Sequence, residues 1–239
     1  MPKLLLTLLV SASFLITGCA GSGSDPTDPL EGLNRATFKF NDVVDTAVLE
    51  PTAKAYRDVV PQPARTGIRN VLTNLKSPTV IANNILQGDV TGAADATTRL
   101  VANSLLGLGG LVDVASMGGV KAEEEDFGQT LGAWGVGAGP YIVLPFMGPS
   151  NVRDVAGIVV DNYSDPLNLY LNNTDQDGWM YARVATATID KREELLTILA
   201  DLKKNSVDYY TAMKSSYNQR REALIRDNHA DDASLPDIQ

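Results

Sequence analysis

An uncharged stretch from Phe127 to Val152 constrains this chain more than any other segment. The stretch is long enough to cross a bilayer as a helix, which needs about 20 residues. Its glycines, among them Gly135, Gly137 and Gly139, each cost about 1 kcal/mol in a helix interior, and Pro140 costs about 3. One straight helix is therefore excluded. Such an apolar but broken backbone either forms a buried loop in a soluble core or lies at membrane depth where other protein covers it.

The N-terminus has the pattern of a bacterial lipoprotein signal. Lys3 precedes an uncharged, mostly apolar run from Leu4 to Ile16, and Thr17-Gly18-Cys19 follows. Ile16 stands where Leu is more common. Cys19 is the only cysteine, so it has no disulfide partner in the chain. We predict that residues 1–18 are removed and that Cys19 becomes the lipidated N-terminus.

The segment 19–28 is rich in Gly, Ser, Pro and Asp and is predicted to be a flexible tether. No Asp follows Cys19 directly. In enteric bacteria an Asp at that position resembles a signal for retention at the inner membrane. Its absence predicts the outer membrane as the destination.

The charge balance limits the possible partners. The formal net charge is −9, and removal of residues 1–18, which carry one Lys, makes it −9 − 1 = −10. A chain this acidic is not expected to bind nucleic acid or to be held electrostatically on anionic lipid headgroups. The remaining length fits one domain, predicted to span 29–228. Beyond the signal, no unbroken apolar segment is long enough for a regular transmembrane helix.

Hydrophobic spacing predicts an all-α fold. Leu33, Thr37, Phe40, Val44 and Ala47 share one helix face, and Pro51 is expected to start a further short turn. The residues from Val59 to Pro63 are predicted to break the helix. Three helices are expected next: one from Pro63 to about Leu75, one opened by Ser77-Pro78 and ended by Gly88, and one capped by Asp89 and ended by Gly107. A further helix is expected to be capped by Ser150 and to close before Pro166, followed by an apolar connector at 167–171 and a polar turn at 172–178. One helical region from Trp179 to Arg226 and a disordered acidic tail at 229–239 complete the prediction.

The residues that enzymes use for catalysis are scarce. The only histidine, His229, lies in the predicted tail, which argues against a Ser-His-Asp triad and a histidine metal site. No G-x-S-x-G, dinucleotide or P-loop motif is present. The acidic run Glu123 to Asp126 could hold Ca²⁺, but such a surface cluster is more often only solvated. We expect no catalytic residue, no metal and no cofactor.

Several stretches resemble the MlaA (VacJ) family of outer-membrane lipoproteins. They occur in the family's order and cover nearly all of the mature chain. The stretches are DPLEGLNRATFKFN (28–41), VVPQPARTGIRNVLTNLKSP (59–78), LQGD (86–89), TRLVANSLLGLGGLVDVA (98–115), DFGQTLGAWGVGAGPYIVLPF (126–146) and, within 192–221, REELL and SVDYYTAMKSSYNQRR. LGLGGLVDVA and the glycine-rich stretch are long and specific. The chain departs from relatives mainly in its acidic tail and around Asn172 to Trp179.

The resemblance implies a helical ring in the inner leaflet of the outer membrane, surrounding an amphipathic channel. Such proteins remove phospholipids mislocalised in the outer leaflet, pass them to a periplasmic carrier, MlaC, and associate with trimeric porins. Two other interpretations remain open: a scaffold that only binds a porin or another envelope partner, and a lipid-cleaving enzyme. The scaffold does not explain the uncharged Gly/Pro run, and the enzyme is disfavoured by the missing histidine.

Two predictions concern particular residues. We expect a loop that borders the lipid path, with the rings of Trp134 and Tyr141 near an interface. Its candidate residues are Trp134, Gly135, Gly137, Gly139, Pro140 and Tyr141. The alternative is that these glycines only permit tight packing. We also expect the helix from Trp179 to Arg226 to lie outside the channel and to face partners, because it carries a mixed charged face that includes Lys191, Arg192, Lys203, Arg220 and Arg221.

Overall fold

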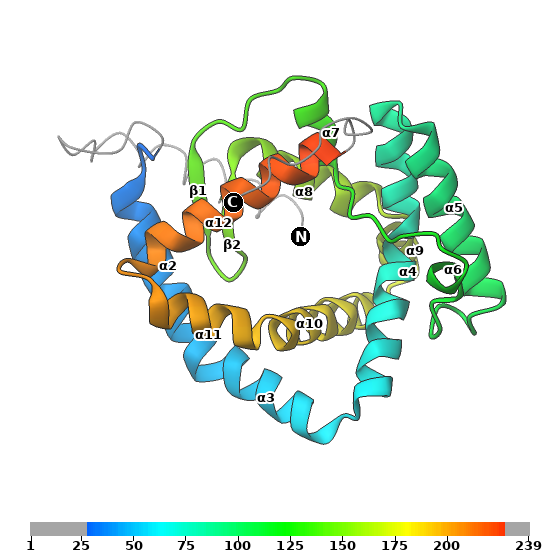
Figure 1. The fold of residues 1–239 in the computed structure, drawn as a ribbon, viewed down its shortest axis with the longest axis horizontal. Coiled ribbons are helices and arrows are strands. Elements are labelled where there is room, and N and C mark those ends of the chain that lie inside the picture. Colours follow the sequence, from blue (N-terminus) through cyan, green and yellow to red (C-terminus); the bar gives the residue numbers. More distant parts are fainter. Residues whose placement is uncertain (1–27, 228–239) are drawn as a thin grey trace, which may run out of the picture.

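The computed structural model describes residues 28–227 (Figure 1). The predicted signal, Cys19, nearly all of the tether and the acidic tail therefore lie outside the described residues. Within them, the helices follow one another around an open centre. Helices α2 (Glu31–Val44) and α3 (Glu50–Val59) form one side, and α4 (Gln62–Gln87) stands opposite (Figure 1). Helices α10 (Asp177–Glu194) and α11 (Leu196–Asn205) run back toward the start of the chain (Figure 1).

The chain begins with one long helical rod. It consists of α2 (Glu31–Val44), a π-helical turn η2 (Asp45–Leu49) and α3 (Glu50–Val59). The helix predicted from Leu33 is confirmed, but no break precedes Pro51. A proline ring and its missing N–H do not fit a regular α-helical turn, and the π-helical turn lies directly before it. Val60 is extended, with φ −94° and ψ 118°, which confirms the predicted interruption before Pro61.

The longest helix, α4 (Gln62–Gln87), corrects a prediction. Two helices separated at Ser77-Pro78 were expected, whereas one helix of 26 residues contains Pro78 in its interior. Its extensive packing against α5 (Val90–Leu105) outweighs the hydrogen bond that Pro78 cannot donate. Gly88, with φ 80°, ends α4 as expected. Asp89 then caps α5 by accepting a hydrogen bond from the Gly92 N–H at 2.9 Å.

A small hairpin interrupts the helices. After α6 (Val114–Met117) and α7 (Phe127–Ala133), strands β1 (Tyr141–Leu144) and β2 (Gly148–Asn151) pair antiparallel, with Tyr141 opposite Asn151. No strand was predicted, because four residues are too few for a recognisable alternation. The all-α, single-domain prediction is still confirmed. Asn151, not Ser150, caps α8 (Val152–Ser164).

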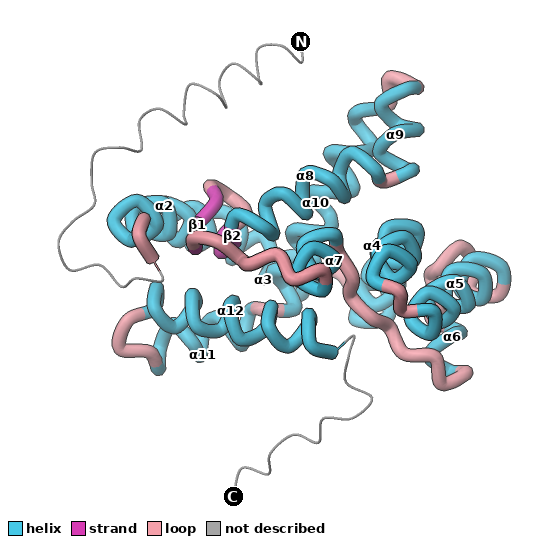
Figure 2. Tube along the Cα trace, turned by 90° about the horizontal axis from the view of Figure 1, so that it is seen from above, coloured by secondary structure: helices cyan, strands magenta, loops and turns pink. Residues whose placement is uncertain are grey.

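The C-terminal part forms four helices, α9 (Pro166–Asn173), α10 (Asp177–Glu194), α11 (Leu196–Asn205) and α12 (Tyr209–Asp227). The apolar connector expected at 167–171 is therefore helical, started by the Asp165 cap. The single helix expected from Trp179 is three helices, broken at Leu195 and at the extended Ser206. Viewed from above, α9 projects away from the ring on the side opposite α12 (Figure 2).

Candidate functional site

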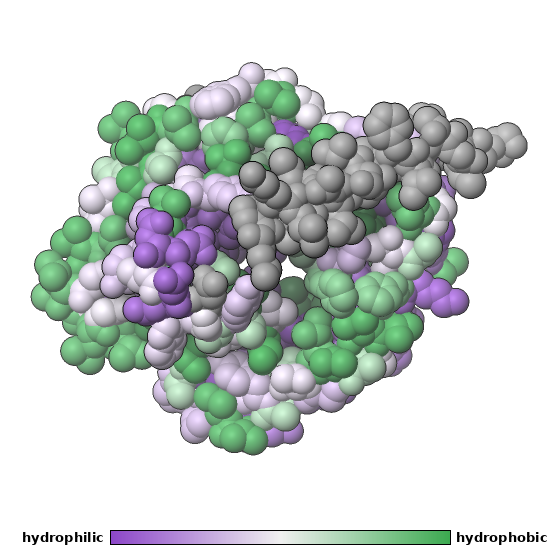
Figure 3. All heavy atoms as spheres, turned by 180° about the vertical axis from the view of Figure 1, so that it is seen from behind, coloured by the Kyte–Doolittle hydropathy of each residue, from purple (hydrophilic) through white to green (hydrophobic). Residues whose placement is uncertain are grey.

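Burial in this chain is the reverse of that in a soluble domain. The largest fully buried side chains are all polar: Gln129, Asn34, Asn84, Thr130 and Asp28. Large apolar side chains are exposed on almost every element, for example Val90 at 80% and Met117 at 78%. Apolar residues cover much of the outer rim in the space-filling view, which is hollowed near its centre (Figure 3). Apolar patches of this extent indicate an apolar environment around the molecule.

The buried polar groups hold distant elements together. The side-chain amide of Asn34 in α2 donates to the Tyr141 carbonyl at 2.9 Å and accepts from the Val143 N–H at 2.9 Å. Asn41, two turns later, makes the same pair of contacts with the Leu144 carbonyl and the Phe146 N–H. Helix α2 therefore satisfies one edge of the hairpin, as a third strand would.

Asp28 is buried and belongs to this arrangement. It accepts hydrogen bonds from Asn34 at 2.8 Å and from the Tyr210 hydroxyl, and Lys214 lies 3.4 Å away. The tether predicted to extend through residue 28 therefore ends at least one residue earlier. The burial of Tyr210 and its hydrogen bond to this carboxylate both raise the pKa of the tyrosine.

The uncharged stretch forms α7, the loop 134–140 and the hairpin. Gly135 and Gly139 have φ of 84° and 69°, a region that side chains rarely adopt. A Cβ at Gly139 would also lie 3.2 Å from the Val152 Cβ. Gly137 has no such φ, and a Cβ there would meet nothing within 4 Å. The backbone conformation and the close contact with Val152 therefore favour glycine at position 139, whereas neither favours it at position 137.

The structure separates the candidate loop residues into two groups. Gly139, Pro140 and Tyr141 line a pocket of about 470 Å³ together with Arg153 and Arg221. The remaining candidates, Trp134, Gly135 and Gly137, do not line it.

Only one of the two candidate aromatic rings lies at the surface. Trp134 is 53% exposed, and its Nε1–H donates to the Leu86 carbonyl at 3.0 Å. The prediction that the ring of Tyr141 lies near an interface is wrong. Tyr141 is 3% exposed and packs between Tyr210 and Tyr217, with ring centroids 6.2 and 6.1 Å away. This burial raises the pKa of its hydroxyl.

An ionic cluster fastens the uncharged stretch to α12. Arg221 donates to Asp126 at 2.6 Å and to Asp154 at 3.0 Å, and Arg153 donates to Asp154 at 3.0 Å. Burial alone would raise the pKa of Asp126, but the hydrogen bond and charge of Arg221 outweigh it and hold that pKa below its usual value. The sequence indicated none of these pairings, because Arg221 reads as one of two adjacent surface arginines.

A second set of ion pairs closes the ring between its first and last thirds. Glu193 of α10 accepts from Arg57 at 3.0 Å and from Arg65, while Asp190 accepts from Arg69 at 2.9 Å. Arg192 donates to Asp45 at 2.6 Å.

These contacts correct the prediction that all five basic residues form an outward charged face. Arg192 is buried within the fold, and Arg221 is partly buried. Lys191, Lys203 and Arg220 are exposed, and their partners in the chain are Glu194, Asp42 and Glu124.

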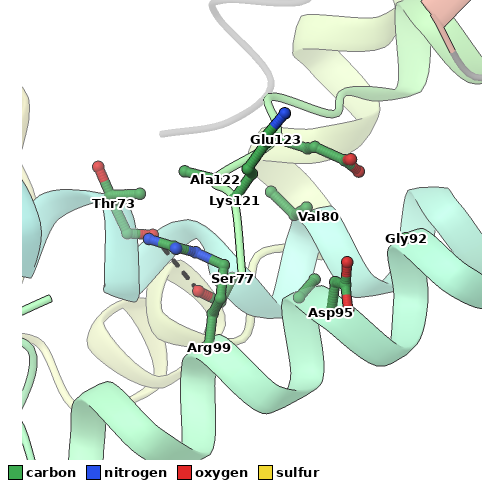
Figure 4. A pocket seen from close by; sticks show the side chains of 10 residues that line it. Thr73, Ser77, Val80, Gly92, Asp95, Arg99, Lys121, Ala122 and Glu123 are labelled. Atoms are coloured by element: carbon green, nitrogen blue, oxygen red, sulfur yellow. Dashed lines mark hydrogen bonds between the residues drawn. The ribbon is translucent and has the colours of Figure 1, made fainter. Parts of the chain in front are cut away.

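The acidic run 123–126 is largely used within the fold. Asp126 caps α7, Glu125 accepts from Gln87 at 2.7 Å, and Glu124 accepts from Arg220 at 2.6 Å. Side chains of α4, of α5 and of residues 121–123 meet around a pocket of only about 20 Å³ (Figure 4). Within residues 28–227, no group of three or more His, Cys, Asp or Glu side chains is placed to hold a metal ion.

Among known protein families, the MlaA lipoprotein family matches residues 26–224. The chain belongs to the MlaA lipoprotein family. The intermembrane phospholipid transport system lipoprotein MlaA of Escherichia coli K12 is 37% identical over 244 residues, covering 99% of this chain and 95% of that protein. The Haemophilus influenzae protein of the same description is 33% identical, covering 98% and 96%.

A solved MlaA-like structure has the same fold as this family member. It comes from work on the structural basis for maintenance of bacterial outer membrane lipid asymmetry, and it superposes with a TM-score of 0.73 at 40% identity. The match covers 83% of this chain and 98% of the other. In the described part of this MlaA family member, no helix has both the length and the hydropathy of a membrane-spanning helix.

Proposed function

We propose that this MlaA family member is an outer-membrane lipoprotein that maintains lipid asymmetry. It removes phospholipids mislocalised in the outer leaflet and passes them to a periplasmic carrier, MlaC. An acylated Cys19 anchors it on the periplasmic side. The observation that carries the proposal is the reversed burial: the largest fully buried side chains are polar, and large apolar side chains are exposed on most elements.

The energetics of lipid transfer call for this arrangement. Two acyl chains contain roughly 30 methylenes, and exposing them to water would cost on the order of 20 kcal/mol at about 0.8 each. The sequence has no P-loop that could couple nucleotide hydrolysis to this step. The protein lowers the barrier instead, because the headgroup passes through the hollow centre of the ring while the acyl chains remain in apolar surroundings.

The loop 134–140 borders the lipid path in this proposal. Its position beside a pocket of about 470 Å³, its lack of charge and its glycine-rich backbone support that role. A Cβ added at Gly137 would meet nothing within 4 Å, so no packing contact requires glycine there. The competing interpretation, that the glycines serve packing alone, applies best to Gly139.

The apolar rim also supports the proposed surroundings and partners. The ring lies in the inner leaflet of the outer membrane, next to a trimeric porin, and exchanges lipid with the soluble carrier. The protein catalyses no covalent reaction. A scaffold that only binds a porin would share the rim, but it would not need a hollow centre.

Complementation tests the proposal. A strain that lacks its own MlaA protein is supplied with this chain, and outer-leaflet phospholipid is measured with a membrane-impermeant labelling reagent. The purified protein is analysed by mass spectrometry for bound lipid. Restored asymmetry with intact phospholipid supports transport. Bound lysophospholipid would indicate an enzyme, and no lipid with no restoration would indicate a scaffold.

A further inference from the structure

An apolar groove lies between α4, α9 and α10, apart from the loop and its pocket. Its volume is about 570 Å³. Helix α4 contributes Ile68, Leu72 and Leu75, and α9 contributes Leu167 and Leu171. Leu171, one of these lining residues, is buried and only 6% exposed.

Charge is nearly absent from the groove. Arg183 is the one charged residue that lines it, and its Nη2 donates to Asp165 at 2.6 Å. Asp165 in turn is fixed as the cap of α9. Asp165 thus balances the charge of Arg183, although the Arg183 Nη1 is buried without a hydrogen-bond partner among the described residues. The rest of the lining is mostly apolar, so the groove favours an apolar occupant.

Two of the apolar residues that line the groove are themselves exposed. Trp179 is 69% exposed, and Leu111, from the segment between α5 and α6, has about half its surface exposed. Tyr170 of α9 and Tyr181 of α10, two of the helices that form the groove, are also exposed. Trp and Tyr concentrate at the boundary between acyl chains and headgroups, because one part of each ring system is apolar and another is a hydrogen-bond donor.

We propose that this groove holds one acyl chain of a membrane phospholipid. The proposal rests on the membrane location in the proposed function. An acyl chain has no hydrogen-bonding groups, and the groove offers few. An extended peptide would bring an N–H and a C=O with every residue, each needing a partner. Other parts of this chain fit poorly, since the tether is polar, the tail 229–239 is acidic, and the apolar run Leu4–Ile16 belongs to the signal that we predict is removed.

The two tryptophans of the chain, Trp134 and Trp179, make a direct test possible. The Trp134→Phe variant leaves Trp179 as the only fluorescent indole. This full-length variant is reconstituted into nanodiscs of phosphatidylethanolamine and phosphatidylglycerol with bromine on the acyl chains, and quenching of Trp179 is measured. We expect strong quenching by the brominated lipid and weak quenching by aqueous iodide.

Filling the groove separates a bound chain from the surrounding bilayer. Ala182 lines the groove, whereas Ala185, one turn along the same helix, is also exposed and does not line it. In the Trp134→Phe background, Ala182→Phe should remove most of the quenching, and Ala185→Phe should leave it unchanged. Native mass spectrometry should show that Ala182→Phe, but not Ala185→Phe, loses one bound phospholipid.

Three outcomes would overturn the proposal. These are no quenching by brominated lipid, equal quenching in the two phenylalanine variants, and protection of Trp179 only when a trimeric porin is added. The last would assign the groove to a protein. Outer-leaflet phospholipid is measured in parallel. Wild-type protein that restores asymmetry with an empty groove contradicts only the groove, whereas failure to restore asymmetry contradicts only the proposed transport.

Discussion

The guanidinium of Arg221 donates a hydrogen bond of 2.6 Å to the carboxylate of Asp126, although 95 residues separate them in the chain. Its other terminal nitrogen lies 3.0 Å from Asp154. Through this one side chain, α12 holds the start of α7 and the start of α8, the two helices that flank the loop and the hairpin. The position of the uncharged stretch therefore depends on an ionic contact made at the far end of the sequence.

Replacing Arg221 with Ala should destabilise the fold by about 3 kcal/mol, because it leaves Asp126 without its cationic partner and the buried Asp154 with Arg153 alone. Arg220→Ala is the matched control. Arg220 is adjacent and pairs with an exposed Glu124, so its loss should cost less than about 1 kcal/mol. Thermal unfolding of both variants in the same detergent, followed by circular dichroism, measures the difference. Equal melting temperatures would show that the Arg221 cluster does not stabilise the fold.

Lowering the pH should destabilise the connection between α5 and α6, where Asp113 lies. Burial of Asp113 opposes ionisation, but hydrogen bonds from Ser116, Arg99 and Asn103 prevail and lower its pKa to about 2. The unfolded value is about 3.9, so the carboxylate contributes stability above about pH 4 and loses it as the pH falls toward 2.

The Asp113→Asn variant should test this dependence. At pH 7 it should lose on the order of 1–2 kcal/mol, allowing for solvent screening, and the loss should shrink as pH falls through this window. Asp58→Asn, at an exposed position of α3, is the control and should change little at any pH. A constant difference between wild type and Asp113→Asn from pH 7 to pH 2 would contradict the assignment.

Two glycines of the loop should respond differently to the same substitution. Gly137→Val meets no obstacle, so the protein should fold and accumulate normally while outer-leaflet phospholipid and detergent sensitivity change. Gly139→Val combines a strained φ with a close contact to Val152, and its abundance should fall. Immunoblotting of membranes alongside the outer-leaflet assay separates the effects. If Gly137→Val is abundant and fully active, the loop does not gate the path.

Lipidation should depend on Cys19. Cys19→Ser should accumulate as an uncleaved or mislocalised precursor, because the modifying step requires the thiol. Ser22→Ala, which leaves the signal intact, should be processed normally. Labelling with radioactive palmitate and fractionation of the membranes report both steps. Normal cleavage and outer-membrane recovery of the serine variant would rule out the lipid anchor.

Helix α11 presents one exposed apolar residue that could contact a partner. Ile198 is 61% exposed, whereas Leu196 in the same helix is buried. A photo-crosslinking residue at 198 should capture porin or the periplasmic carrier, and one at 196 should capture neither. Capture of lipid alone at position 198 would contradict a partner-facing role.

The local signals in the sequence determined much of the secondary structure. Gly88 and Asp89 mark a helix end and a helix start by their own conformational and hydrogen-bonding preferences, and both occur in the structure. The same local reasoning failed at Pro78, where packing of α4 on α5 keeps a proline inside a continuous helix. Helix α9 was missed because its eight residues are too few to show a clear periodicity.

The burial of side chains was decided by tertiary structure alone. Nothing local distinguishes Tyr141, which is buried, from Trp134, which is exposed, or Arg221 from Arg220. The difference arises because closing the ring brings α12 against the hairpin and α7, and a charged or aromatic side chain is buried only where distant partners surround it. The sequence by itself determined most of the helices, local signals such as Gly88 and the Asp89 cap, and the uncharged, glycine-rich stretch. The buried polar contacts, the exposed apolar rim and the groove lined by Trp179 exist only once those helices are assembled, because each is built from elements far apart in the chain.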